Sequence, residues 1–73
     1  MSDFSYKIVS HIATISERGS WALELNLISW GGGPATFDLR RWNEDHTKMG
    51  KGISLTGEEV KALSKFLALS PIG

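Results

Sequence analysis

One stretch of alternating side chains, WALELNLISW at residues 21–30, limits the possible folds more than any other part of the chain. Leu23, Leu25 and Leu27 occupy every second position within it. Only an extended strand sends alternate side chains to opposite faces. The stretch therefore predicts a strand whose leucine face lies toward the core and whose other face lies toward solvent.

A first strand is predicted before this stretch. Residues 5–16, SYKIVSHIATIS, are rich in β-branched side chains, which favour strands. Their apolar phase slips near Ser10 and His11, which predicts a bulge or bend there. Residues 17–20 have the composition of a turn.

Two further strands follow. Phe37 and Leu39 alternate with polar residues and predict a third strand with the same core face. Glycines and a proline at residues 31–34 permit a hairpin between the second and third strands. A polar loop at 44–48 then leads to a fourth strand at 52–55.

A helix is predicted at the C-terminal end. Thr56 and Glu59 have the spacing of a capping box, and Pro71 is expected to end the ordered chain. Apolar residues sweep about 180° of the helix, whereas one buried face needs little more than about 100°. We expect the sheet to cover part of this arc and a second copy of the helix to cover the rest. The predicted fold is α+β, a four-stranded antiparallel sheet followed by a helix (ββββα), in a two-fold homodimer through the helix.

Chain length, composition and net charge limit the class of protein. A chain of 73 residues is expected to form one domain, over residues 1–73, that needs a staple or a partner for stability. It has no cysteine and two histidines, so we expect no disulfide and no metal site. No apolar run is long enough for a membrane span and no signal segment is evident, so we expect a cytoplasmic protein. The formal net charge is zero, so a nucleic-acid site would have to come from local clustering of charge.

Catalytic motifs do not emerge. Gly31–Gly33 lacks a following GK[ST], and the lysine between Gly50 and Gly52 lacks the rest of a phosphate-binding loop. His46 beside Asp45 could be a base with its orienting acid, but no motif places a nucleophile near it. We expect no catalytic residues, no cofactor and no enzyme activity.

The tryptophans carry the functional signal. Trp21 lies in the leucine phase and is expected in the core or at its rim, whereas Trp30 and Trp42 lie on the opposite, outward face. Three explanations compete for the outward pair: a protein interface, packing under the bend of the first strand, or a platform for stacked bases. Nearby cations favour the platform, because single-strand binders combine aromatic stacking with a basic track. Those cations are Arg40, Lys48 and Lys51.

The chain also resembles a known family. The segments that carry the likeness are Trp21-x-x-Glu24-Leu25-Asn26, Ser29-Trp30, Asp38-Leu39-Arg40-x-Trp42, Asp45-His46-x-Lys48-Met49-Gly50-Lys51-Gly52-Ile53 and Leu55. They are similar to the YdbC-type bacterial branch of the positive-cofactor-four transcriptional coactivator family. The resemblance implies a dimer that binds single-stranded DNA across its sheet without strong sequence preference.

Family positions map onto particular residues. The resemblance implies that Trp30 and Trp42 stack on bases. It also implies that three cations contact the phosphate backbone of the DNA and that the polar Asn26 lies on the same face. The three cations are Arg40, Lys48 and Lys51. Eukaryotic relatives carry more cations on the second strand, where this chain has Glu24, Leu27 and Ile28.

The resulting hypothesis is a homodimeric, sequence-non-specific binder of single-stranded DNA that assists transcription, replication or repair. RNA is not distinguished from DNA, because stacking and phosphate contacts do not test for a 2′-hydroxyl. The alternative is a protein-interaction module of a dimeric transcription accessory that uses its outward tryptophans. The hypothesis requires that Trp30 and Trp42 project from the solvent side of one sheet.

Overall fold

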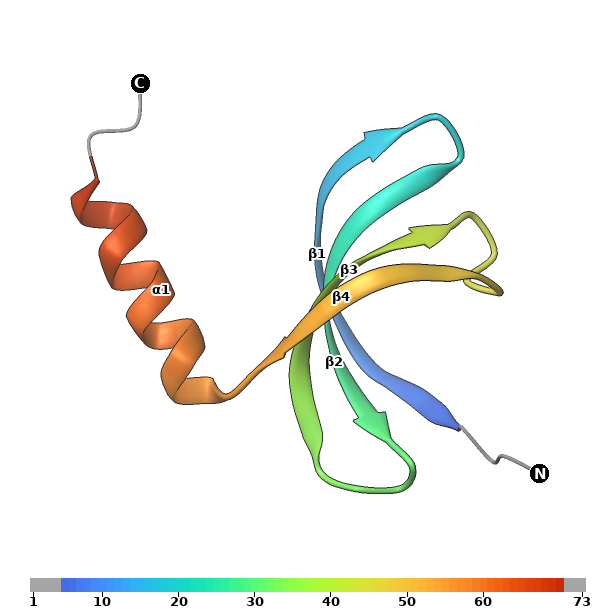
Figure 1. The fold of residues 1–73 in the computed structure, drawn as a ribbon, viewed down its shortest axis with the longest axis horizontal. Helices are drawn as coiled ribbons and strands as arrows, with labels where there is room; N and C mark the ends of the chain where they lie inside the picture. The colour runs from blue at the N-terminus through green and yellow to red at the C-terminus, as the bar shows by residue number, and fades with distance from the viewer. Residues whose placement is uncertain (1–4, 71–73) are drawn as a thin grey trace.

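The computed structural model describes residues 5–70, which form one antiparallel sheet and one helix (Figure 1). The sheet order follows the chain, β1-β2-β3-β4. This arrangement confirms the predicted α+β architecture of four strands followed by a helix. The elements are β1 (Tyr6–Arg18), β2 (Trp21–Trp30), β3 (Ala35–Asn43), β4 (Met49–Leu55) and α1 (Gly57–Leu69).

Strand β1 lies at one edge of the sheet and is irregular. Its register with β2 shifts between Ile8 and Ser10, again between His11 and Ala13, and a third time beyond Thr14. The first two shifts confirm the bulge expected near Ser10 and His11. Each shift leaves one residue of β1 without a partner on β2, which bends the strand and increases its twist.

The connections differ slightly from the prediction. Strand β1 continues to Arg18, so the turn before β2 is shorter than expected and uses Gly19 at a φ of 62°. The hairpin between β2 and β3 lies at the expected glycines, with Gly31 and Gly32 at positive φ. Strand β4 begins at Met49, before the expected position 52.

The inside of the sheet is the face opposite to the one predicted. We name the two sides the leucine face (Leu23, Leu25, Leu27, Phe37, Leu39 and Ile53) and the tryptophan face (Glu24, Asn26, Ile28, Trp30, Asp38, Arg40 and Trp42). Five of the seven residues on the tryptophan face are buried, namely Glu24, Asn26, Ile28, Asp38 and Trp42. Residues of the leucine face are only partly buried, and Ile53 is 54% exposed.

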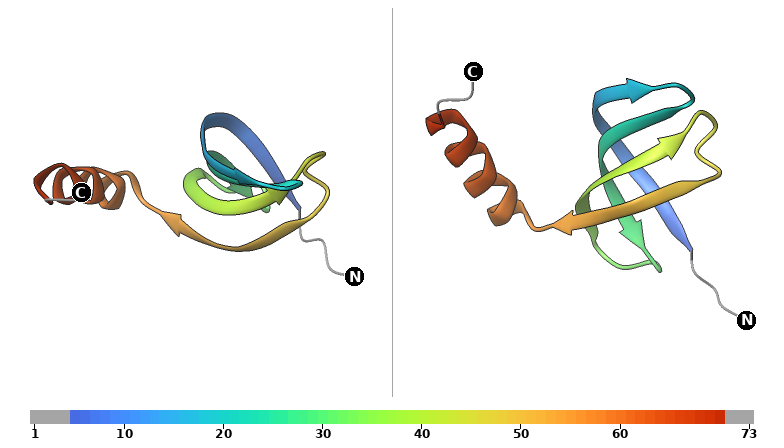
Figure 2. Two further views of the ribbon diagram at one scale, coloured as in Figure 1. Left: turned by 90° about the horizontal axis from the view of Figure 1, so that it is seen from above. Right: turned by 45° about the horizontal axis from the view of Figure 1, so that its top comes forward.

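Curvature explains the reversal. The sheet curls strongly along its length (Figure 2), so that one face closes on itself and the other is spread outward. Strand β1 folds over the tryptophan face, where its Tyr6 contacts Trp30 and Trp42, and the buried Trp42 and Ile28 fill the interior. Trp21, at the start of β2, lies at the rim with 36% of its surface exposed.

Helix α1 stands apart from the sheet, beyond the end of β4 (Figure 1). Its predicted capping box is confirmed: Glu59 N donates to Thr56 Oγ1 at 3.1 Å, and Thr56 N donates to the Glu59 carboxylate at 2.8 Å. The sheet covers much less of its apolar arc than expected, because Val60 alone among the helix residues 57–69 is partly buried and the others are exposed. Pro71 lies outside the described residues.

The described helix is also too short and too polar to cross a membrane.

Candidate nucleic-acid interface

The tryptophan face brings the predicted aromatic residues together. Antiparallel pairing sets Trp42 opposite Ala22 and Arg40 opposite Glu24, so these side chains leave the same side of the sheet. Tyr6, from β1, lies between the indoles, with its ring centroid 5.6 Å from that of Trp30 and 5.6 Å from that of Trp42. Trp30 and Trp42 therefore share one face, as expected.

Trp42, however, does not face solvent. Its exposed fraction is 0%, because Tyr6 covers it on one side and the His46 ring lies 5.3 Å away. The expectation of an open indole at this position is wrong, so the requirement that both tryptophans project into solvent is not met and Trp30 alone of the pair stays partly exposed. The curl of the sheet carries β1 and the β3–β4 loop over the ring, and the sequence pattern does not encode that curl.

Trp30 and Arg40 form the more accessible part of the face. Trp30 is partly buried, and the guanidinium carbon of Arg40 lies 4.9 Å from the centre of its ring. Arg40 donates from Nε and Nη2 to the two oxygens of Asp38, at 2.7 and 2.8 Å. Asp38 is fully buried, so this two-point ion pair fixes the guanidinium plane over the indole.

Gly52 makes room for Arg40. The two residues are opposite one another on β4 and β3, and a Cβ at position 52 would lie 2.6 Å from Arg40 Nε and 2.8 Å from the Leu39 carbonyl oxygen. A side chain cannot occupy that space without moving the arginine. The glycine in the Lys-Gly-Ile segment is therefore needed for the close approach of Arg40 to the sheet.

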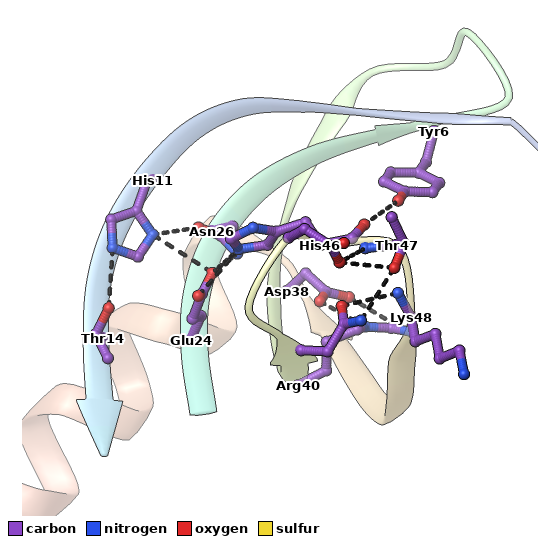
Figure 3. A network of polar contacts seen from close by, with 12 residues as sticks. Tyr6, His11, Thr14, Glu24, Asn26, Asp38, Arg40, His46, Thr47 and Lys48 are labelled. Carbon is purple, nitrogen blue, oxygen red and sulfur yellow. Dashed lines mark hydrogen bonds and ion pairs between the residues drawn. The ribbon is translucent and has the colours of Figure 1, made fainter. Parts of the chain in front are cut away.

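A second polar group surrounds Glu24 (Figure 3). Because a carboxylate only accepts hydrogen bonds, Asn26 turns its amide nitrogen toward Glu24, at 3.1 Å, and its carbonyl oxygen toward His11, at 2.7 Å. His11 Nδ1 therefore carries a proton, and when the ring is neutral its Nε2 accepts from the Thr14 hydroxyl at 3.2 Å. His46 donates from Nε2 to both Glu24 oxygens, each at 3.0 Å.

This environment favours the charged form of Glu24. Burial raises the pKa of its carboxyl, but hydrogen bonds from His46 and Asn26, together with the charge of His46 and His11 when protonated, outweigh burial and leave the pKa below its usual value of 4.5. Glu24 is therefore an anion inside the tryptophan face at neutral pH.

The β3–β4 loop closes over this face. His46 adopts a left-handed backbone with a φ of 60°, and the Tyr6 hydroxyl donates to its carbonyl oxygen at 3.2 Å. Asp45 accepts from the Thr47 backbone at 3.2 Å, and Asn43 accepts from the Lys48 backbone at 2.9 Å. These contacts hold the loop in place and leave the Lys48 side chain exposed.

The structure thus separates the predicted site residues into three groups. Trp30 and Arg40 are partly buried, while Trp42 and Asn26 are fully buried, and all four lie on the tryptophan face. Lys48 is exposed on the loop that closes this face. Lys51 is also exposed, but it borders a shallow cavity together with Leu23, Leu39 and Ile53 of the leucine face.

Sequence reasoning missed the roles of Tyr6, His11, Glu24 and His46. Glu24 lies in phase with the tryptophans, which was a signal that it shares their surroundings. The contacts of Tyr6, His11 and His46 depend on the curl and on the loop, so spacing alone does not predict them. Among residues 5–70 no group of three or more potential ligand side chains is arranged to hold a metal ion.

Comparison with known proteins adds independent information. Residues 17–66 match the family model described as Transcriptional Coactivator p15 (PC4). The match runs from the end of β1 through the other strands into α1. An uncharacterized protein of Treponema pallidum (strain Nichols) is 46% identical over 66 residues, which cover 89% of this chain and 78% of the relative.

Proposed function

This chain belongs to the transcriptional coactivator p15 (PC4) family, and from that premise we propose that it is a dimeric, sequence-non-specific binder of single-stranded DNA. It serves as an accessory to transcription, replication or repair and is not an enzyme. The observation that carries the proposal is the fixed Arg40 guanidinium over the Trp30 ring, on a face lined by further aromatic rings. Single-strand binders use such surfaces to stack bases.

The burial of the site residues gives each a different role. Trp30 and the flat guanidinium of Arg40 form the stacking surface. Because Asp38 already neutralises Arg40, phosphate attraction comes mainly from Lys48 on the loop. Lys51 contacts the phosphate backbone of a bound DNA strand that continues around the outer edge of β4. The buried Trp42 and Asn26 support this surface from beneath.

Dimer formation is the second part of the proposal. Leu63, Phe66 and Leu67 of α1 are 44%, 63% and 52% exposed, and the leucine face of the sheet is also incompletely covered. An exposed apolar surface of this kind indicates an interaction site. A second copy of the chain supplies matching apolar surface under two-fold symmetry.

A titration tests the binding. Intrinsic tryptophan emission and the anisotropy of a labelled 15-nucleotide dT oligomer are followed at low salt, with duplex of equal length and a ribo-oligomer as competitors. We expect quenching by the single strand, weak competition by duplex, and weaker binding by Trp30→Ala. Unchanged emission together with equal affinity for duplex would contradict the proposal.

The protein-interaction alternative gives a different result. It requires outward tryptophans, and the burial of Trp42 leaves Trp30 as the main member of that pair. Absence of nucleic-acid binding at low salt, together with a stable protein partner in pull-down experiments, would favour it.

A further inference from the structure

A small cavity on the tryptophan face has no role in the proposal above. It has a volume of about 190 Å³ and is lined by Ile8, His11, Glu24, Asn26 and His46. Clefts for drug-sized ligands are typically ~300–1,000 Å³, so this one suits a single ring. Figure 3 shows its polar lining, in which Glu24 lies between His11 on β1 and His46 on the β3–β4 loop.

The hydrogen bonds of Glu24 are unevenly distributed between its two oxygens. Oε1 accepts from Asn26 and His46, whereas Oε2 accepts from His46 alone among the described contacts. An ionised carboxylate offers about four acceptor positions, so Oε2 retains room for another donor. Glu24 is 7% exposed, and a ligand donor that reaches it would meet a largely desolvated charge.

Among the described contacts, no neighbouring polar group other than His46 donates to Oε2. The Asn26 amide is committed to Glu24 through nitrogen and to His11 through oxygen. The imidazole side chains of His11 and His46 are 49% and 40% exposed, so they offer flat surfaces at the mouth of the cavity. The cavity therefore combines an acceptor at its base with walls that suit a planar ring.

We propose that this cavity receives one base of a bound strand and selects bases that carry an exocyclic amine, with Glu24 accepting a hydrogen bond from that amine. Cytosine has an N4 amine and a single ring, so it fits both the acceptor and the volume. Thymine presents a carbonyl oxygen at the equivalent position, which repels the carboxylate. Adenine has the amine but is larger. Glu24 thus adds a base preference to a surface that otherwise stacks any base.

This inference rests on the proposed single-strand binding, and the test separates the two. Unlabelled 15-nucleotide oligomers of dC, dT and dA compete with a labelled mixed-sequence single strand at pH 7.5. We expect dC to bind at least about fivefold more tightly than dT, because cytosine donates a hydrogen bond to Glu24 where thymine presents a carbonyl oxygen. Adenine should fall between them.

Two changes locate the effect, one on the ligand and one on the protein. An oligomer of 2-pyrimidinone deoxynucleotides, which lack only the amine of cytosine, should lose the advantage of dC with the wild-type protein. Glu24→Gln preserves the shape of the side chain and should bring the dC to dT ratio below about twofold. Glu44→Gln is the matched control at an exposed glutamate and should keep the wild-type ratio.

Each outcome has one meaning. Equal, measurable affinities for dC and dT would overturn the inference and leave the proposed function intact. A dC preference that survives removal of the amine or of the Glu24 charge would also overturn it. Failure of every single strand to bind would contradict the proposed function itself. Because the pyrimidinone arm uses wild-type protein, the result does not depend on the folding of a variant.

Discussion

At the scale of single residues, Glu24 links stability to pH. Its pKa in the folded protein lies below the usual value of 4.5, so the folded state favours the ionised form. The corresponding stability is present above the unfolded pKa and is lost as the pH falls through the folded one. We expect the thermal midpoint of the wild type to fall more steeply between pH 5 and pH 3 than that of Glu24→Gln. Parallel curves in circular dichroism melts would contradict this assignment.

Substitution of Trp42 should affect mainly folding stability, whereas substitution of Trp30 should affect mainly DNA binding. Trp42 is fully buried, and truncation of a large aromatic residue in a core typically costs ~3–5 kcal/mol. We expect Trp42→Ala to lower the free energy of unfolding by about that amount in urea titrations. Trp30→Ala should have a smaller effect on unfolding and a larger one on dT binding. Equal stability losses for the two variants would show that their roles do not differ in this way.

Gly52 gives a test of the close approach between β3 and β4. Gly52→Ala places a Cβ against Arg40 Nε and the Leu39 carbonyl, and such overpacking typically costs ~1–3 kcal/mol. We expect reduced stability in urea titrations and weaker oligonucleotide binding, because Arg40 must move from the Trp30 ring. Gly50→Ala is the control on the same strand, since a Cβ there would have its nearest neighbours at 3.9 Å. Similar behaviour of the two variants would contradict the argument.

At the scale of the secondary-structure elements, alternation predicted a great deal. It located β2 at its observed bounds and placed Trp30 and Trp42 on one face, while the spacing of Thr56 and Glu59 identified the capping box of α1. Alternation did not predict which face would be buried. A period of two shows which residues share a face, but the buried face depends on the direction in which the sheet curves. The curl depends on the successive bulges of β1 and on Tyr6 reaching over Trp42.

Helix α1 has the clearest prediction at this scale. Phe66 is 63% exposed in the protomer, so Phe66→Glu should not disturb the protomer fold but should disfavour an apolar contact between copies. Size-exclusion chromatography with light scattering is expected to give a dimer mass for the wild type and half that mass for the variant. Lys65→Glu changes charge at an adjacent exposed position and should leave the dimer intact. A wild-type monomer at high micromolar concentration would contradict the dimer.

At the scale of the whole molecule, charge balance limits how strongly phosphate contacts contribute. The chain has eight basic and eight acidic residues, and Arg40 is already paired with Asp38. The salt slope of binding to a single strand is about −0.7 per phosphate contact. We therefore expect a shallow dependence of affinity on salt, reduced by about 0.7 per binding site in Lys48→Ala. A steep slope that is unaffected by this substitution would point to a different cationic surface.

The slipped register of β1 has a consequence for self-association. Its shifts skip Val9, Ile12 and Ile15, whose side chains are 53%, 43% and 55% exposed along an outer edge of the sheet. A regular edge of this composition would be a template for fibril growth, since unpaired backbone groups recruit further strands. Repeated bulges interrupt that template. The irregular strand that closes the interior thus also blocks repeated edge-to-edge addition of further strands.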